Sequence, residues 1–240
     1  TFGYIDAMAE MAEEYPDVIF LHCSGYLSND SNFGNYFGKM YQPRYLAGLQ
    51  AGEMTTSNKI GYVAAFPIPE VIRGINAFAS GVKEVNPDAT VEVVWTFTWF
   101  GPEEETQAAN ALIETGVDVL AQHQDSPSTG VVAEANGAKW ISYNTNYGQS
   151  AAPEAYAGAP VWDWGPYYVS VVNSIIDGEF SGGAYWGGME TGLVSYDTIF
   201  DQGPLADLIS GVQAEIISGD FDPPIVEEEF IENVIGTVSP

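Results

Sequence analysis

Positive charge is scarce in this chain of 240 residues. Six Lys and Arg stand against 33 Asp and Glu, so the formal net charge at pH 7 is −27. A surface this acidic repels phosphate backbones and anionic membranes, and we therefore expect no nucleic-acid partner. Disorder does not explain the acids, because 46% of the residues are hydrophobic and 13% are aromatic. We interpret the acids as the solvated surface of a protein adapted to very high salt, where counterions screen the self-repulsion.

Other absences narrow the chemistry. Cys23 is the only cysteine, so no disulfide can form within the chain, and we expect it to be buried as a small apolar residue. The only histidines, His22 and His123, have no second ligand at metal spacing, so we expect neither a metal site nor a cofactor. No apolar run reaches the roughly 18 residues that span a membrane. The P-loop, G-x-G-x-x-G and G-x-S-x-G motifs are absent as well.

Apolar runs and amphipathic segments alternate along the chain, and the stretch 59–81 shows this most clearly. Residues 60–65 have the β-branched content of a buried parallel strand, Pro67 and Pro69 force a turn, and Val71, Ile75 and other apolar residues then recur at helical spacing. The same reasoning predicts strands at 18–22, 36–37, 91–95, 117–121, 140–143 and 192–196, and helices at 45–54, 102–114, 128–136, 167–176 and 205–217, besides one that ends at Tyr15. This alternation predicts an α/β fold with parallel sheets covered by helices on both faces.

The alternation also suggests where the chain crosses between two lobes. We place an N-terminal lobe at 1–57, a C-terminal lobe at 58–158 and a return to the first lobe at 159–184. A closing strand, helix and acidic tail follow at 185–240, and their lobe is left open. Because the parallel strand expected at 18–22 needs an earlier strand beside it, we expect one or two βα units to precede Thr1.

Aromatic and polar side chains follow successive strands of the predicted sheet. The loops that carry them include Phe66, Trp99, the segment 122–126, the segment 144–146 and the segment 162–164. Strand ends in a doubly wound sheet converge on one crevice, where aromatic faces and the amides and carboxylates beside them suit a planar ring with polar edges. Each loop taken alone is also compatible with a purely structural role. Trp140 lies inside a strand pattern, and we expect it in the core.

Several segments together resemble one family. They are Phe2-Gly-Tyr-Ile-Asp-Ala7, residues 61–78 around Ala65-Phe-Pro-Ile-Pro-Glu70, Val85-Asn-Pro-Asp88, Thr98-Trp-Phe100, Ala121-Gln-His-Gln-Asp-Ser126, Trp162-Asp-Trp-Gly-Pro-Tyr-Tyr168 and Tyr185-Trp-Gly-Gly188. Nearly the whole chain, in order, is similar to the basic membrane protein family, whose members are substrate-binding lipoproteins of ABC importers related to purine-nucleoside receptors.

The resemblance implies a fold and a place in the cell. It implies two doubly wound parallel-sheet lobes of the type I periplasmic-binding fold, joined by a hinge that closes over a ligand. It also implies a preceding part of roughly 70 residues, in keeping with two βα units of about 30 residues each. That part would carry a signal peptide with a lipidated cysteine and an aromatic wall of the site. We therefore expect a monomer anchored at the extracellular face of the membrane or in the periplasm, with a membrane permease as its partner.

The resemblance also implies roles for particular residues. By position, Trp99 matches the aromatic residue that stacks on a purine, and Asp6 matches a polar residue near the ligand. Asn144 falls where relatives place an aspartate that holds ribose, whereas Asp125 and Trp162 belong to a subgroup pattern. We therefore expect a non-enzymatic receptor for a small purine ligand. The rivals are a nucleoside-processing enzyme, which would need a positioned acid or nucleophile, and a regulator of the same fold, which would need a basic DNA-binding appendage.

Two substitutions favour a free base over a nucleoside. Nucleoside-binding relatives are expected to carry a lysine that reaches the ribose where this chain has Trp162, and the ribose-holding aspartate is replaced by Asn144. Asp125, Asn144 and Asp163 are then expected to pair with ring-edge donors such as an exocyclic amine. The expectation is adenine first, with a nucleoside as the alternative ligand and a hinge-packing role as the alternative for Trp162.

The net charge generates a prediction about salt. Folding is expected to be markedly more stable in molar KCl than in dilute buffer, because a Debye length of about 3 Å at 1 M screens the repulsion between acids. Thermal unfolding followed between 0.1 and 2 M KCl measures this directly. A melting temperature that does not change with salt would contradict the halophilic interpretation.

Overall fold

The computed structural model describes residues 3–236, and the chain divides into two compact units. Unit 1 consists of Thr1–Lys39 and Asp163–Val194, and unit 2 consists of Met40–Trp162 and Ser195–Pro240. Residues 1–2 and 237–240 lie outside the described residues. They include the start of the predicted N-terminal lobe and the end of the predicted acidic tail. Among the residues described, no helix has both the length and the apolar character needed to cross a membrane.

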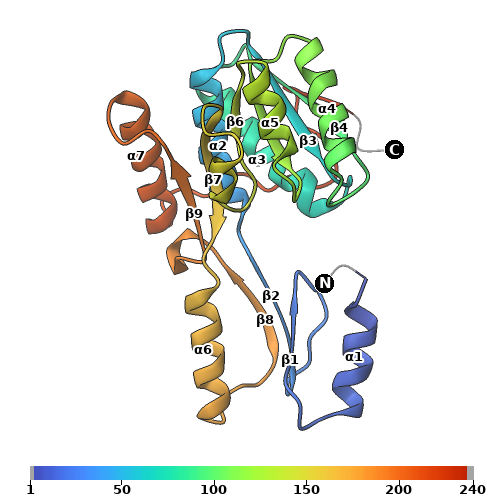
Figure 1. The fold of residues 1–240 in the computed structure, drawn as a ribbon. Helices are drawn as coiled ribbons and strands as arrows, with labels where there is room; N and C mark the ends of the chain where they lie inside the picture. The colour runs from blue at the N-terminus through green and yellow to red at the C-terminus, as the bar shows by residue number, and fades with distance from the viewer. Residues whose placement is uncertain (1–2, 237–240) are drawn as a thin grey trace. The chain divides into compact units, whose positions relative to one another are not determined.

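Unit 2 is built on a mainly parallel sheet, several strands of which are labelled in Figure 1. Within residues 3–236 this sheet has seven strands in the order β10-β4-β3-β5-β6-β7-β9. The strands are β3 (Lys59–Ala64), β4 (Thr90–Trp95), β5 (Val119–His123), β6 (Lys139–Ile141), β7 (Tyr156–Trp162), β9 (Val194–Thr198) and β10 (Val234–Ile235). Strands β10, β4, β3, β5, β6 and β7 pair in parallel with their neighbours.

Helices cover both faces of this sheet, and successive side chains of the inner strand β3 point to opposite faces. The helices of the unit are α2 (Tyr41–Met54), α3 (Pro69–Val85), α4 (Pro102–Glu114), α5 (Ser128–Ala135) and α7 (Pro204–Ser218), with a short 3₁₀ turn, η1 (Tyr147–Ser150). Tyr62 of β3 contacts Phe78 of α3, with ring centroids 5.4 Å apart. The next residue, Val63, belongs to the cluster on the other face, which includes Leu112 of α4, Val132 of α5 and the fully buried Trp140. The predicted core position of Trp140 is confirmed.

Helix α2 is buried on all sides and packs closely on α3. Every residue from Tyr41 to Gly52 is buried. A Cβ added at Gly48 would lie 1.9 Å from the carbonyl oxygen of Phe78, and one at Gly81 would lie 2.2 Å from that of Tyr45. Only glycine at these positions allows the two helix backbones to approach so closely.

Unit 1 contains a smaller parallel sheet. Its described strands are β1 (Phe20–Cys23), β2 (Phe33–Gly38) and β8 (Gly183–Gly187), in the order β1-β2-β8. The helices are α1 (Ile5–Glu14) and α6 (Gly165–Ile176), with a 3₁₀ turn, η2 (Met189–Thr191). Aromatic rings hold α6 on the sheet: Tyr36 of β2 stacks on Tyr167 at 4.8 Å, and Tyr167 contacts Tyr185 of β8 at 4.5 Å. Cys23 is half-buried, and burial raises the pKa of its thiol.

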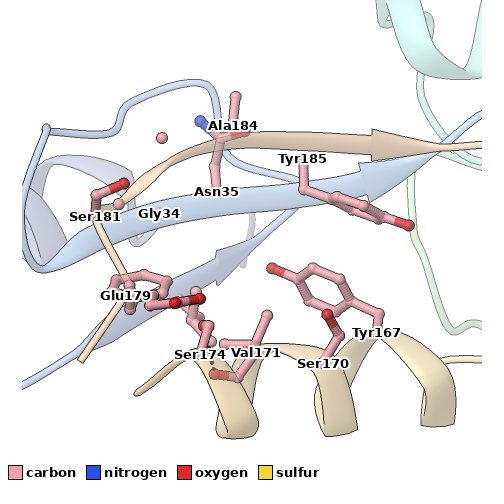
Figure 2. A pocket seen from close by; sticks show the side chains of 14 residues that line it. Gly34, Asn35, Tyr167, Ser170, Val171, Ser174, Glu179, Ser181, Ala184 and Tyr185 are labelled. Carbon is pink, nitrogen blue, oxygen red and sulfur yellow. Dashed lines mark hydrogen bonds between the residues drawn. The ribbon is translucent and has the colours of Figure 1, made fainter. Parts of the chain in front are cut away.

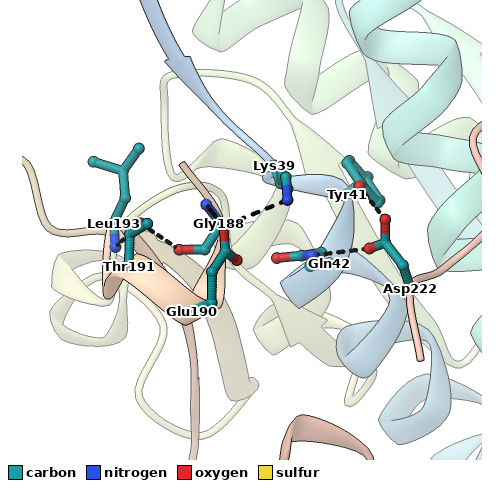
Figure 3. A network of polar contacts seen from close by, with 8 residues as sticks. All are labelled: Lys39, Tyr41, Gln42, Gly188, Glu190, Thr191, Leu193 and Asp222. Carbon is teal, nitrogen blue, oxygen red and sulfur yellow. Dashed lines mark hydrogen bonds and ion pairs between the residues drawn. The ribbon is translucent and has the colours of Figure 1, made fainter. Parts of the chain in front are cut away.

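Polar contacts within each unit fix the segments next to the points where the chain changes unit (Figure 3). In unit 1, Glu190 of η2 accepts from the Lys39 ammonium at 3.4 Å and from the Gly188 backbone at 3.1 Å. In unit 2, the Asp222 carboxylate accepts from the Tyr41 hydroxyl and the Gln42 amide, each at 2.8 Å. The first residues of α2 are therefore tied to the segment that follows α7.

The structure confirms the predicted fold class, while several boundaries differ. Helix α4 occupies the predicted residues 102–114, because Pro102 and three glutamates mark its first turn. Strand β8 was not among the predicted strands. Strand β5 continues to His123, two residues beyond the predicted end, because His123 pairs with Ala64 in β3. The units separate between residues 39 and 40 rather than at 57, since α2 packs on α3 of unit 2.

The close approach of α2 and α3 generates a prediction. Gly81→Ala is expected to destabilise the protein by about 1–3 kcal/mol, because the new methyl group would meet the backbone of Tyr45 rather than a side chain that can move. Gly211→Ala is the matched control. Gly211 lies in helix α7 with nothing within 4 Å of an added Cβ, so alanine there should stabilise by roughly 0.5–1 kcal/mol. Chemical unfolding of both variants tests this, and equal effects would contradict the contact.

Candidate functional site

The unit 2 residues that the sequence predicted as ligand-binding all lie at one edge of the sheet. Phe66 follows β3, Trp99 follows β4, Asp125 follows β5 and Asn144 follows β6, while Trp162 is the last residue of β7. These strands are neighbours in the order β4-β3-β5-β6-β7 and run in parallel, so their carboxyl ends meet at the same edge. Ligands in open α/β sheets bind at this edge.

The loops after β3 and β4 bring two aromatic rings together. The ring centroids of Phe66 and Trp99 are 5.5 Å apart, and both side chains are partly exposed. The backbone N–H of Asp125 donates to the carbonyl oxygen of Trp99 at 2.9 Å, and the Gln124 amide donates to the Thr96 hydroxyl. The loops that carry Trp99 and Asp125 are therefore joined, so the aromatic ring and the carboxylate are held on one rigid support.

The loop after β5 is shaped by buried polar side chains. The Gln122 amide donates to the carbonyl oxygens of Gln124 and Ser126 at 2.8 and 2.7 Å, and its own oxygen accepts from the indole of Trp140 at 2.9 Å. Glu105 of α4 accepts from the Ser126 hydroxyl at 2.6 Å. Burial raises the pKa of Glu105, and the partial loss of water around Asp125 raises the pKa of that carboxyl too. These bonds fix the backbone from which Asp125 projects toward solvent.

A cluster of charged and polar side chains lies at the same strand ends, and sequence reasoning missed it. Nε2 of the fully buried His123 lies 3.1 Å from a carboxylate oxygen of Glu70, in the first turn of α3. Burial, and then the charge of Arg44, lower the pKa of His123. Burial alone would raise the pKa of Glu70, but the hydrogen bond from His123 and the charge of Arg44 outweigh it and lower that pKa. The carboxylate is therefore ionised and accepts from a neutral imidazole.

Arg44 of α2 links this cluster to Asn144. One guanidinium nitrogen donates to the Tyr62 hydroxyl at 3.0 Å, and the other donates to Oδ1 of Asn144 at 3.3 Å. The guanidinium carbon lies 5.2 Å from the centroid of the Tyr143 ring. Asn144 has a φ of 57°, a left-handed conformation that asparagine tolerates better than most residues. The Asn144 oxygen, which was expected to meet a ligand donor, thus already accepts from Arg44.

Two of the predicted site residues belong to unit 1. Asp6 lies in the first turn of α1 and is exposed. Asp163 precedes α6, and its carboxylate accepts from the backbone N–H of Gly165 at 3.1 Å, a contact that supports the start of that helix. Asp163 also borders a groove of about 210 Å³ with Tyr167 and Tyr185. The ligand-binding roles of Asp6 and Asp163 stay predictions.

A second groove in unit 1 lies between α6 and the sheet (Figure 2). It has a volume of about 290 Å³ and is lined by residues that include Asn35, Ser170, Ser174, Glu179 and Ser181. None of the residues predicted to bind ligand lines it. Residues 3–236 contain no group of three or more His, Cys, Asp or Glu side chains that could hold a metal ion.

The sequence of this chain is similar to those of known binding proteins. The model of a family described as ABC transporter substrate-binding protein, PnrA-like, matches residues 1–216. A provisionally named ABC transporter glucose-binding protein of Haloferax volcanii is 45% identical over 92% of the chain, and a purine-binding protein of Brucella abortus is 37% identical over 93%. The chain spans 57% and 63% of the lengths of these two relatives.

Solved structures show the same fold at low sequence identity. A solute-binding protein of an ABC transporter system from Conexibacter woesei aligns with a TM-score of 0.74 at 22% identity, covering 93% of this chain and 77% of its own. A transcriptional activator of the comK gene from Bacillus halodurans aligns with a TM-score of 0.81 at 20% identity, covering 92% and 77%. Type I periplasmic-binding proteins share this architecture, as predicted.

Proposed function

Because this chain belongs to the Bmp family of PnrA-like ABC transporter substrate-binding proteins, we propose that it captures a purine base, adenine in the first place, for import. The family consists of binding proteins rather than enzymes, in agreement with the sequence analysis. The observation that carries the proposal is the pair of partly exposed rings, Phe66 and Trp99, beside a carboxylate and an amide at the carboxyl edge of the unit 2 sheet. A flat, aromatic ligand with donors and acceptors on its edge suits such a set.

A free base is favoured over a nucleoside by Trp162. This ring ends β7 at the position where a ribose-binding lysine is expected in nucleoside-binding relatives. Asn144 also stands where an aspartate would hold ribose, and the Asn144 oxygen already accepts a hydrogen bond from Arg44. The Brucella abortus relative, by its name, binds purines, which supports the same ligand class.

A sugar is the second candidate ligand. The Haloferax volcanii relative is named for glucose binding, and aromatic rings can pack on sugars as well as on bases. A nucleoside is the third, because a more distant relative from Lactococcus lactis is named as a nucleoside-binding protein. We further propose that the protein works outside the cell as a lipid-anchored monomer that passes its ligand to a membrane permease.

The proposed ligand generates a prediction of selectivity. Adenine is expected to bind more tightly than adenosine by about 1–3 kcal/mol, because the sugar would lose water without finding the donor that a lysine provides. Titration calorimetry of the intact protein with adenine, adenosine and glucose, in 2 M KCl, measures all three candidates under one condition. Equal affinity for adenine and adenosine would contradict the preference for a base, and binding of glucose alone would contradict the purine class.

The stacking role of Trp99 generates a second prediction. Trp99→Ala is expected to weaken adenine binding by about 1–3 kcal/mol, the range for base–aromatic stacking, with little change in the melting temperature of the free protein. Phe100→Ala is the matched control, since Phe100 is 64% exposed in the same loop. A large loss of stability with unchanged affinity would assign Trp99 to the core instead.

A further inference from the structure

We propose that Arg44 is a positioning residue that holds Asn144 as a hydrogen-bond donor, so that the site selects a ligand with an acceptor at that edge. This inference rests on the proposed function, because it names the polarity of one contact in the same site. It depends on three properties of Arg44: its burial, its fixed position and its chemistry as a donor.

Arg44 is held in place from several directions. Its side chain is 2% exposed, in a helix buried on all sides. The Tyr62 hydroxyl accepts from one end of the guanidinium, and the Tyr143 ring lies against it. A Cβ added at Gly74 of α3 would lie 2.9 Å from Cδ of Arg44, so the stem of the side chain rests on that helix. The guanidinium therefore cannot turn away from Asn144 without moving buried neighbours.

The chemistry of Arg44 then fixes the orientation of the Asn144 amide. A guanidinium only donates hydrogen bonds, so the Asn144 atom 3.3 Å from it must be the oxygen. The amide nitrogen is directed to the other side. Among residues 3–236, no acceptor pairs with this nitrogen, and the side chain is partly exposed. Asn144 thus offers N–H groups to a ligand.

The donor at Asn144 reverses the polarity expected from the sequence. The Asn144 oxygen already accepts from Arg44, whereas its amide N–H groups are unpaired among residues 3–236, so a ring nitrogen with a lone pair suits this amide better than an exocyclic amine does. Adenine has such acceptors at N1, N3 and N7, and its amine can donate to the Asp125 carboxylate at the neighbouring strand end. One donor and one acceptor on adjacent loops therefore match the mixed edge of a base.

Analogues that lack one ring nitrogen test the donor role. We measure the affinity of the intact protein for adenine and for 1-, 3- and 7-deazaadenine by titration calorimetry. One analogue is expected to bind at least tenfold more weakly than adenine, and Asn144→Asp should abolish that difference, because a carboxylate cannot donate. Arg44→Met should reduce it, whereas Tyr62→Phe, which removes only the other partner of the guanidinium, should preserve it. The same deaza penalties in wild type and Asn144→Asp would overturn the proposal.

A measurement without ligand separates this inference from the proposed function. Asn144→Asp should raise the melting temperature by roughly 2–4 °C, because the new carboxylate pairs with Arg44. Asn146→Asp adds the same charge to an exposed position of the same loop and should not raise it. If adenine fails to bind while the two variants differ in this way, the purine proposal fails and the Arg44 contact stands. If both variants lower the melting temperature alike, Arg44 does not orient residue 144.

Discussion

The close contact between α2 and α3 determines how unit 2 is built. Both helices contribute a glycine where the backbones meet, Gly48 and Gly81, and any larger residue would collide with a carbonyl group. This contact buries α2 within the unit and places its first turn close to the carboxyl ends of the strands. Because α2 is buried at this point, its residue Arg44 places a positive charge next to the candidate site.

Burying Arg44 would be unfavourable without the groups around it. Its charge is balanced by Glu70, which stays ionised because His123 and Arg44 both stabilise the carboxylate. His123 remains neutral, since burial and Arg44 both lower its pKa. Beneath the candidate site lie Arg44, Glu70 and His123, whose charges balance one another. The partly exposed residues above them are the aromatic rings and Asn144.

The sequence predicts the fold well where local signals are strong. Pro102 and the glutamates after it define α4, and alternating apolar runs predict the parallel sheet. Strand β8 escaped prediction because glycines on both sides hide a short run that pairs with β2. The placement of α2 in unit 2 escaped because the decisive contacts, at Gly48 and Gly81, join residues far apart in sequence.

The candidate site likewise contains residues that the sequence predicts and residues that it does not. Phe66, Trp99, Asp125 and Asn144 could be predicted because each follows a strand and because the family resemblance singles out the last three. The topology does bring these parallel strand ends together, while the roles of the residues stay predictions. Arg44, Glu70 and Tyr143 could not, because a cation in one helix and an acid in the next carry no local signal of pairing. His123 offered a hint, as one of two histidines. Its burial became evident only with the pairing of β5 and β3.

The position of the site residues has a consequence for evolution. Phe66, Trp99, Asp125 and Asn144 stand in loops just beyond the strands, while the glycines and core side chains that hold the unit together stand within helices and strands. A loop residue can change without disturbing the packing beneath it. The side chains that would contact a ligand can therefore change while the fold is kept.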